Sequence, residues 1–440
     1  MFMATQVNAN PTKELFISML TRDIDIRAAI LELIDNSIDG AKRLRPNGDF
    51  SDLYIDITFD AEHFTIKDNC GGMGIDIAKE YAFRFGRPSK RLQETSNQQF
   101  TGIFGIGMKR SLFRLGNFFS VSSTTQKESF LLNVDVEKWV QDDDTNWTFT
   151  LDDEKNNLDN PIENTGTTIE IQKLHDGIKK QFGLSFFENS LISYIEKFKT
   201  LAIENGLTIR INDKNVVFTS ESIIESSDVH PYTFSITQDS VTIKIIAGIA
   251  PKGKPEKAGW YVYCNGRLVV FADKTSLTGW GESDVRQYHP SLAFFRGFVF
   301  FESYDLEQLP WNTTKTNVDA SSEYYIFAKT KMRDATLQIT KDCSAIMDNE
   351  IPEDKQATLF SKSNLTYLNS TSIVRLTEKQ TPFTLNVTEI KYKEPMSNIS
   401  FQKPTSQVDI VKRKLSAKTN KDLGVKVFDY YFKRECVDDE

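Results

Sequence analysis

Between residues 27 and 42 the apolar positions recur every three or four residues, a spacing that predicts one amphipathic helix. At about 100° per residue the aliphatic side chains gather on one side of this helix. They are Ile26, Ile30, Leu33, Ile34, Ile38 and Ala41. The opposite side carries Glu32, Asp35, Asn36 and Asp39. We expect the apolar side to face a core around which the rest of the chain is organised.

The polar side of this helix has two interpretations. A solvated helix face is the commoner one. Its three carboxylates, however, have no compensating Lys or Arg before Lys42. Like charges one turn apart repel by roughly a few tenths of a kcal/mol, which a bound cation would relieve. Glu32 and Asn36 lie one turn apart, the spacing at which a carboxylate orients a water while an amide oxygen binds Mg²⁺.

Alternating and helical patterns along the rest of the chain predict an α+β protein. In the first part we expect a helix at 11–20 and strands at 53–59, 64–67, 118–124, 129–136, 147–151 and 167–172, with an acidic loop at 141–164. In the second part we expect a helix at 184–203, strands at 207–212, 216–219, 232–237, 241–250, 259–263, 268–271 and 298–301, a hairpin turn at 264–267, and a closing helix at 322–345.

A glycine-rich stretch, DNCGGMGI, occupies residues 68–75 directly after a predicted strand. A plain hairpin turn explains these glycines about as well as a binding site does. In a site, glycines let the backbone approach a flat ligand, and Asp68 accepts a hydrogen bond from an exocyclic amine such as that of adenine. The hydroxyl of Thr167 is placed to reach the same aspartate, although a β-favouring strand residue is the simpler explanation.

A second glycine pattern, G-x-x-G-x-G, is formed by Gly102, Gly105 and Gly107 at the start of a predicted helix at 101–115. Backbone N–H groups at such a helix start form a cradle for phosphates. The pattern is not a Walker A loop, because Met108 separates Gly107 from Lys109. The preceding polar residues 84–100 predict a mobile loop that covers the site.

Composition limits the possibilities further. The 440 residues are enough for two or three domains, and 39% apolar and 26% charged residues are typical of a soluble globular protein. The first residues lack a secretory signal, so we expect a cytoplasmic protein with four reduced cysteines and no membrane contact. The net charge of −8 argues against a chain coated by nucleic acid, while leaving room for a local basic patch.

Taken together, these motifs resemble the GHKL ATPases, the superfamily of gyrase, the ninety-kilodalton heat-shock chaperones, histidine kinases and MutL. Its four motifs correspond to Glu32, Asn36 and Asp39; Asp68 to Met73; Gly102, Gly105 and Gly107; and Gly166 with Thr167. The second motif departs from the usual D-x-G-x-G, because Cys70 holds the first glycine position. The resemblance implies a Bergerat-type α/β sandwich at residues 1–180 that binds ATP and Mg²⁺.

By this resemblance Glu32 activates the attacking water, Asn36 ligates Mg²⁺ and Asp68 binds adenine. The nucleotide is also expected to contact Asp39, Gly72, Met73, Gly102, Gly105, Ile106, Gly107, Met108, Lys109 and Thr167. Lys109 resembles a phosphate-contacting lysine of the microrchidia proteins. The segment WYVYCNGRLV resembles part of the transducer domain of MutL and microrchidia proteins. We expect such a domain here at residues 181–349. In such domains a loop lysine reaches the terminal phosphate, and Lys315 is the candidate.

The remaining chain predicts a linker or loosely packed region at 350–404 and a short, helical, basic and aromatic extension at 405–440. Phosphate backbones are one possible ligand for this extension, and a docking or dimer helix is the favoured interpretation.

Three functions stay open. The first is an ATP-hydrolysing switch whose ATP-dependent homodimer clamps or remodels DNA or a partner protein. The second is an ATP-gated binding module with negligible turnover. The third, a histidine kinase, would require an acceptor histidine ahead of the nucleotide domain, and His63, His175, His230 and His289 lie elsewhere. The sequence leaves DNA maintenance, phage defence with a partner effector and protein remodelling open as pathways.

Overall fold

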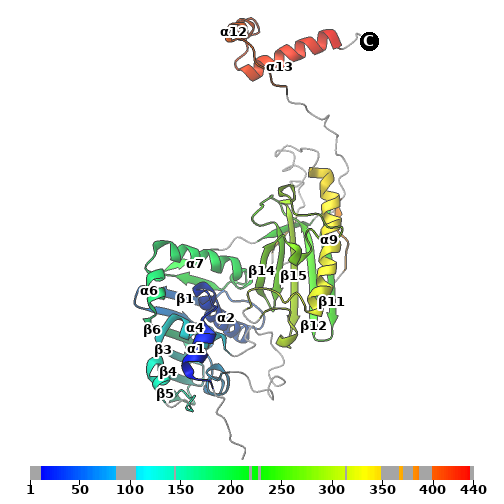
Figure 1. Cartoon of the computed structure of the whole chain (residues 1–440). Helices are drawn as coiled ribbons and strands as arrows, with labels where there is room; N and C mark the ends of the chain where they lie inside the picture. Colours follow the sequence, from blue (N-terminus) through cyan, green and yellow to red (C-terminus); the bar gives the residue numbers. More distant parts are fainter. Residues whose placement is uncertain are drawn as a thin grey trace, which may run out of the picture. The chain divides into compact units, whose positions relative to one another are not determined.

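The computed structural model describes residues 11–85, 106–142, 145–217, 221–225, 229–312, 315–347, 366–369, 380–385 and 399–436. The chain divides into two compact units, Met1–Thr388 and Glu389–Glu440. Figure 1 shows the elements of each unit, a mixture of helices and sheets in the larger one and helices in the smaller. The boundaries between the four regions expected from the sequence remain predictions.

The first half of the larger unit is built on an eight-stranded sheet of order β5-β4-β3-β6-β2-β1-β7-β8. Its strands are β1 (Tyr54–Phe59), β2 (Phe64–Asp68), β3 (Gly116–Thr124), β4 (Ser129–Asp135), β5 (Leu151–Lys155), β6 (Gly166–Leu174), β7 (Thr208–Ile211) and β8 (Lys214–Asn215). Neighbouring strands are antiparallel except for β1 and β7, which are parallel. The large sheet of a mixed α+β fold is therefore present as the sequence predicts.

Helices α1 (Lys13–Thr21), α2 (Ile26–Leu44) and α4 (Gly107–Leu115) lie together in the first half of this unit (Figure 1). The long helix expected at 27–42 is α2, and it begins where the Asp25 carboxylate accepts a hydrogen bond from the Arg27 N–H. Ile30 and Ile34 of α2 pack into one core with Ile55 and Ile57 of β1. Alternate strand residues are buried in this core, so α2 is held against one face of the sheet.

Helices α5 (Val136–Gln141), α6 (Asp176–Phe182), α7 (Ser185–Phe198) and α8 (Thr200–Glu204) complete this half, with a short α3 (Ile75–Ile77) after the first glycine stretch. The prediction of a strand at 147–151 is wrong, because only Leu151 of these residues lies in a strand. The aromatic ring of Trp147 packs edge-on against Trp139 and Phe85 instead. The acidic loop expected at 141–164 contains β5. Its exposed carboxylates do not alternate with apolar residues, so the sequence does not indicate a strand there.

The second half of the larger unit is a five-stranded sheet of order β11-β12-β15-β13-β14. Its strands are β11 (Tyr232–Gln238), β12 (Val241–Ile249), β13 (Gly259–Cys264), β14 (Arg267–Asp273) and β15 (Phe295–Ser303). Short pairs join β9 (Ser222–Glu225) to β16 (Thr366–Asn369) and β10 (Val229–His230) to β17 (Thr384–Leu385). The strand expected at 216–219 is absent at 216–217, and its last two residues lie outside the described ranges.

Both faces of this second sheet are buried, which explains why its strands are almost continuously apolar. On one face the 25-residue helix α9 (Glu323–Met347) packs through Tyr325, Met332 and Ile339. On the other face Tyr263 and Phe300 belong to a core that also contains Phe198 and Leu201 from the ends of α7 and α8. This second core fixes the β13–β14 hairpin relative to the helices of the first half.

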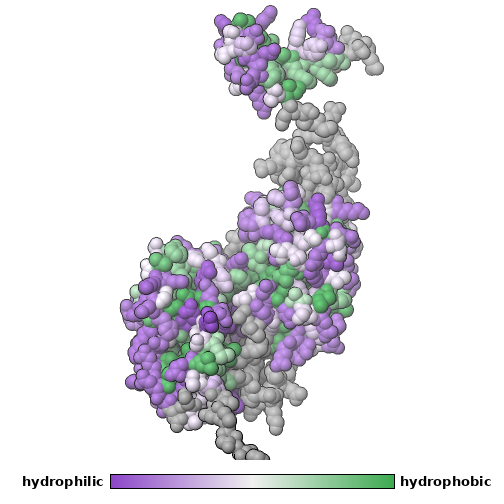
Figure 2. Space-filling model, in the orientation of Figure 1, coloured by the Kyte–Doolittle hydropathy of each residue, from purple (hydrophilic) through white to green (hydrophobic). Residues whose placement is uncertain are grey.

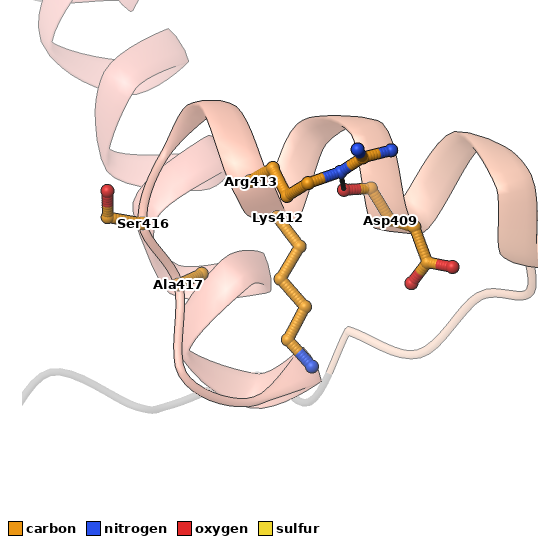
Figure 3. Close-up of a pocket in the computed structure, with 5 residues that line it drawn as sticks. All are labelled: Asp409, Lys412, Arg413, Ser416 and Ala417. Atoms are coloured by element: carbon orange, nitrogen blue, oxygen red, sulfur yellow. Dashed lines mark hydrogen bonds between the residues drawn. The ribbon is translucent and has the colours of Figure 1, made fainter.

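The smaller unit contains α12 (Thr405–Lys414) and α13 (Asn420–Tyr431), in which no residue is buried. Figure 2 shows hydrophobic side chains on its surface, and Phe428, Tyr431 and Phe432 of this region are exposed. A shallow pocket on α12 and the following turn is lined by Asp409, Lys412, Arg413, Ser416 and Ala417 (Figure 3). There the Arg413 Nε donates a hydrogen bond to the Asp409 carbonyl oxygen at 3.3 Å. Within the described ranges, every helix is too short or too polar to cross a lipid bilayer.

Candidate functional site

The acidic face of α2 is buried. Glu32 is 9% exposed, Asp35 is 4% exposed and Asp39 is 6% exposed, whereas Asn36 between them is exposed. A solvated helix face is therefore the wrong interpretation of this stripe. Carboxylates with so little access to water require partners, because burying an isolated charge is unfavourable by several kcal/mol or more.

The partners are three basic side chains from the second part of the chain. Glu32 Oε1 accepts from Arg267 Nη1 at 2.8 Å, and Glu32 Oε2 accepts from Lys315 Nζ at 3.2 Å. Asp35 pairs with Arg267 through one carboxylate oxygen and with Lys199 through the other. Cations of the protein itself thus pair with Glu32 and Asp35, where the sequence suggested a bound cation.

This arrangement changes the pKa values of Glu32, Asp35 and Lys199. Burial raises the pKa of Glu32, but Arg267 and Lys315 outweigh burial and leave that pKa below its ordinary value. The pKa of Asp35 is lowered in the same way, because Arg267 and Lys199 outweigh its burial. Burial lowers the pKa of Lys199 to about 8, with Asp35 opposing the shift. Glu32 is therefore a carboxylate, and a weaker base than a free glutamate.

Asp68 ends β2 and forms the centre of a second polar group. Its Oδ2 accepts from the Ser37 hydroxyl at 2.6 Å, and its Oδ1 accepts from the Cys70 N–H at 2.9 Å and from the Thr167 N–H at 3.2 Å. Burial raises the pKa of Asp68 above its ordinary value despite these donors. Asp68 of β2 and Thr167 of β6, both predicted to lie near the base, are thus adjacent, and Ser37 of α2 joins them.

Thr167 differs from its expected contact. Its backbone N–H, and not its hydroxyl, is bonded to Asp68. The hydroxyl of Thr167 lies 3.0 Å from that of Ser123 on β3, and the Ser123 hydroxyl accepts from the Met73 N–H at 2.8 Å. The loop after Asp68 is therefore fixed to β3 by its backbone, which leaves the Met73 side chain half-buried at the site.

Gly72 lies where this loop crosses the ends of β3 and β6, with φ +67°. A Cβ at this position would stand 2.2 Å from the Thr124 carbonyl oxygen. We expect Gly72→Ala to lower the free energy of unfolding by about 2 to 5 kcal/mol, because a left-handed backbone and a backbone clash add together. Urea denaturation measures this loss.

The matched control for Gly72→Ala is Gly177→Ala in α6, where an added Cβ would meet no atom within 4 Å. Alanine in a helix is favoured over glycine by up to about 1 kcal/mol, so this variant should be neutral or stabilised. Equal urea midpoints for the two alanine variants would show that the Gly72 backbone is not constrained as described.

The second glycine motif is described only from Ile106 onward, and Gly102 and Gly105 lie outside the described residues. Gly107 is the first residue of α4 and lies against the acidic face of α2. A Cβ on Gly107 would stand 2.3 Å from Glu32 Oε2. The start of α4 expected to bind phosphate is therefore adjacent to the candidate base.

Lys109 and Met108, the next two residues of α4, are both buried. The Lys109 Nζ donates to the Ala82 carbonyl oxygen at 2.7 Å and lies 5.7 Å from the centroid of the Phe85 ring. Lys109 thus contacts the segment directly before residues 86–105, which lie outside the described residues and include most of the expected covering loop.

The donor set fits Mg²⁺ bound together with phosphate. In the described part of the chain no group of three or more His, Cys, Asp or Glu side chains forms a metal site of its own. Mg²⁺ keeps several waters and takes one or two protein oxygens beside substrate phosphates. The exposed amide of Asn36, one turn from Glu32 on α2, would supply such an oxygen.

Sequence reasoning missed Arg267, Lys199 and Ser37. The surplus of carboxylates on α2 indicated that cations were needed, but nothing local identified which ones. Arg267 comes from the predicted hairpin turn, which is present: Asn265 has φ 46° and Gly266 has φ 79°. Lys199 separates α7 from α8, and nothing in the sequence around it distinguishes it from surface lysines.

Comparison with known proteins agrees with this geometry. Residues 24–167, about one third of the chain, match the family model described as histidine kinase-, DNA gyrase B-, and HSP90-like ATPase. The match supports the GHKL superfamily for this part of the chain, and with it ATP binding and, in general terms, ATP hydrolysis. It includes α2, Asp68, Gly107 and Thr167, and ends before Lys199, Arg267 and Lys315. No curated protein matches the chain.

Proposed function

We propose that the protein is an ATP-hydrolysing conformational switch of the GHKL type. The observation that carries this proposal is the contact of Glu32 with Lys315, because it joins the candidate base to the second sheet across 283 residues of chain. We assign to the second half of the larger unit the role of a transducer domain, closest to those of MutL and microrchidia proteins. Lys315 is then both a catalytic group and a sensor.

In this proposal each element of the site has one task. Asp68 accepts a hydrogen bond from the exocyclic amine of adenine, supported by Ser37 and the Thr167 N–H. The glycine motif that leads into α4 surrounds the phosphates with N–H groups. Asn36 holds Mg²⁺, which neutralises charge on the phosphates when bound. Glu32 orients the attacking water and accepts its proton.

Lys315 couples hydrolysis to conformation. Its ammonium group pairs with Glu32 at 3.2 Å, and its backbone has φ 51°, an uncommon conformation for a residue other than glycine. Transfer of this ammonium from Glu32 to the terminal phosphate stabilises negative charge there and frees one oxygen of the base. The loop then reports the presence of the γ-phosphate to the second sheet.

We further infer that ATP drives association of two copies, and that the dimer clamps or remodels DNA or a partner protein. Supporting this, the smaller unit presents exposed aromatic residues beside lysines and arginines on helices with no buried residue. Such a unit cannot form a core by itself and is suited to a partner or a second copy.

A second candidate is an ATP-gated binding module with negligible turnover. The pairing of Glu32 with two cations favours it, because a carboxylate whose pKa is lowered accepts a proton poorly. The two candidates share every contact with the nucleotide and differ in the rate of hydrolysis.

Phosphate release and light scattering on the purified full chain test the proposal. With Mg²⁺ and ATP the switch releases phosphate, and with a non-hydrolysable ATP analogue its mass doubles. Doubled mass without phosphate release would support the binding module instead. An unchanged mass together with no phosphate release, with and without duplex DNA, would contradict both candidates.

A further inference from the structure

Five charged side chains meet where α2 contacts the α7–α8 junction and the second half of the larger unit. Glu32 touches Arg267 and Lys315, and Asp35 touches Arg267 and Lys199. All five residues are less than 10% exposed. Within the described ranges, Arg267 is the cation that pairs with both carboxylates, and so it connects two otherwise separate ion pairs.

Arg267 stands on a rigid support. It is the first residue of β14, after a two-residue turn at Asn265 and Gly266 with positive φ at both positions, the geometry that matches the twist of a hairpin. The Asn265 side chain donates to the Ser303 carbonyl at 2.8 Å and accepts from the Ser303 N–H at 2.9 Å. The turn is also tied to α2 itself, because Lys42 Nζ donates to the Asn265 carbonyl at 3.0 Å.

Lys199 supports Arg267 from the other side. It lies at the junction of α7 and α8, is 4% exposed, and pairs with the Asp35 oxygen that Arg267 leaves unused. With Lys199 on one oxygen and Arg267 on the other, the Asp35 carboxylate is held at both ends. Asp35 in turn orients the guanidinium group toward Glu32, which lies one turn earlier on the same helix.

The charges of the cluster are not balanced. Two carboxylates, Glu32 and Asp35, face three cations, Lys199, Arg267 and Lys315, so the formal sum is +1. Removing Lys315 leaves two charges of each sign, with Arg267 on Glu32 and both Arg267 and Lys199 on Asp35. Removing Arg267 separates the cluster into the Glu32–Lys315 and Asp35–Lys199 pairs, so that a later departure of Lys315 would leave Glu32 with no cation.

We propose that Arg267 is a positioning residue that holds the Glu32 carboxylate in place when Lys315 leaves it, and that Asp35 and Lys199 hold Arg267 for this task. The inference rests on the proposed ATPase function. It adds that Arg267 keeps the Glu32 carboxylate oriented while Lys315 moves from Glu32 to the terminal phosphate. The second sheet thus acts on Glu32 twice, through a fixed arginine and through a transferable lysine.

Steady-state ATP hydrolysis by the full chain with Arg267→Met tests this role. We expect kcat to fall about tenfold, because an unrestrained carboxylate spends less time in the productive geometry. The Kd for ATP should stay within about twofold, since Arg267 contacts none of the residues assigned to adenine. The acid limb of the pH profile of kcat should also move to higher pH, because the base loses a positive neighbour.

Two further variants separate positioning from folding. Arg267→Lys keeps the charge, but the lysine ammonium lies one bond nearer the backbone than Arg267 Nη1, the atom that contacts both Glu32 and Asp35. This variant should therefore restore the acid limb more fully than kcat. Arg210→Met is the matched control, because Arg210 forms a two-point ion pair with Asp56 on the eight-stranded sheet. It should leave kcat and the pH profile unchanged. If Arg267→Met does not fold, the kcat and pH profile of Arg267→Lys test the positioning role.

The outcomes distinguish this inference from the function on which it rests. If Glu32→Gln is inactive while Arg267→Met and Arg267→Lys keep the wild-type kcat and pH profile, the positioning role is wrong and the ATPase assignment stands. If Glu32→Gln hydrolyses ATP at the wild-type rate, the ATPase assignment itself is wrong. A fall in kcat for the Arg267 variants with an unmoved pH profile would reduce Arg267 to a structural ion pair and overturn the inference.

Discussion

Replacing Glu32 by glutamine should lower kcat for ATP hydrolysis by about 10²- to 10⁴-fold, the range that a general base contributes. Glutamine preserves the shape of the side chain and a hydrogen-bond acceptor for Arg267 or Lys315. It cannot take a proton from water at neutral pH. Because Glu32 is assigned to the water and not to the nucleotide, ATP binding should survive. Phosphate release and calorimetric titration with ATP measure the two quantities.

The control for Glu32→Gln is Glu163→Gln, at an exposed position in the short 3-10 helix Ile162–Asn164. This variant removes the same charge and should hydrolyse ATP at the wild-type rate. Wild-type turnover in Glu32→Gln would remove Glu32 from the chemistry. Loss of ATP binding in Glu32→Gln would show instead that the buried ion cluster supports the nucleotide site as a whole.

Replacing Asp68 by asparagine should weaken ATP binding by about 100-fold. The amide oxygen can take the place of Oδ1, which accepts from the Cys70 and Thr167 N–H groups at 2.9 and 3.2 Å. The amide NH₂ then occupies the place of Oδ2, and a donor faces the exocyclic amine of adenine. Fluorescence or calorimetric titration with ATP gives the change in Kd.

Two comparisons make the Asp68 result specific. A purine nucleotide with a 6-oxo group, such as GTP, should lose less affinity than ATP, since its oxygen accepts from the new NH₂. Asp76→Asn, on the exposed side of α3, should bind ATP normally. An equal loss for ATP and GTP together with a lowered melting temperature would attribute the effect to folding and not to base recognition.

The two faces of α2 and the position of Asp68 at the end of β2 could be predicted because their information is local. The 3.6-residue period fixed the two faces of α2, and Asp68 and the glycines marked the end of β2. The role of Asp35 was not predictable, because its partners Lys199 and Arg267 are 164 and 232 residues away. A stripe of carboxylates signals that charge must be compensated, yet it does not say whether a metal ion or a distant lysine supplies the compensation.

Errors in the predicted fold have similar causes. Residues 147–150 alternate like a strand, but Trp147 joins an aromatic cluster with Trp139 and Phe85 and takes the segment away from the sheet. Tertiary packing overrides the local pattern there. Strand β5 was missed for the opposite reason, since Asp152, Asp153 and Glu154 give an edge strand the composition of a loop. Exposed charges on an edge strand prevent pairing with other chains.

The central claim is that Glu32, Asn36, Asp68 and the glycine-flanked start of α4 together bind a magnesium nucleotide. Isothermal titration of the full chain with a non-hydrolysable ATP analogue at millimolar Mg²⁺ tests it most directly. The account predicts a saturable heat with one nucleotide per chain, greatly reduced in Asp68→Asn. No heat of binding for the wild-type protein, or an identical isotherm for Asp68→Asn, would contradict it.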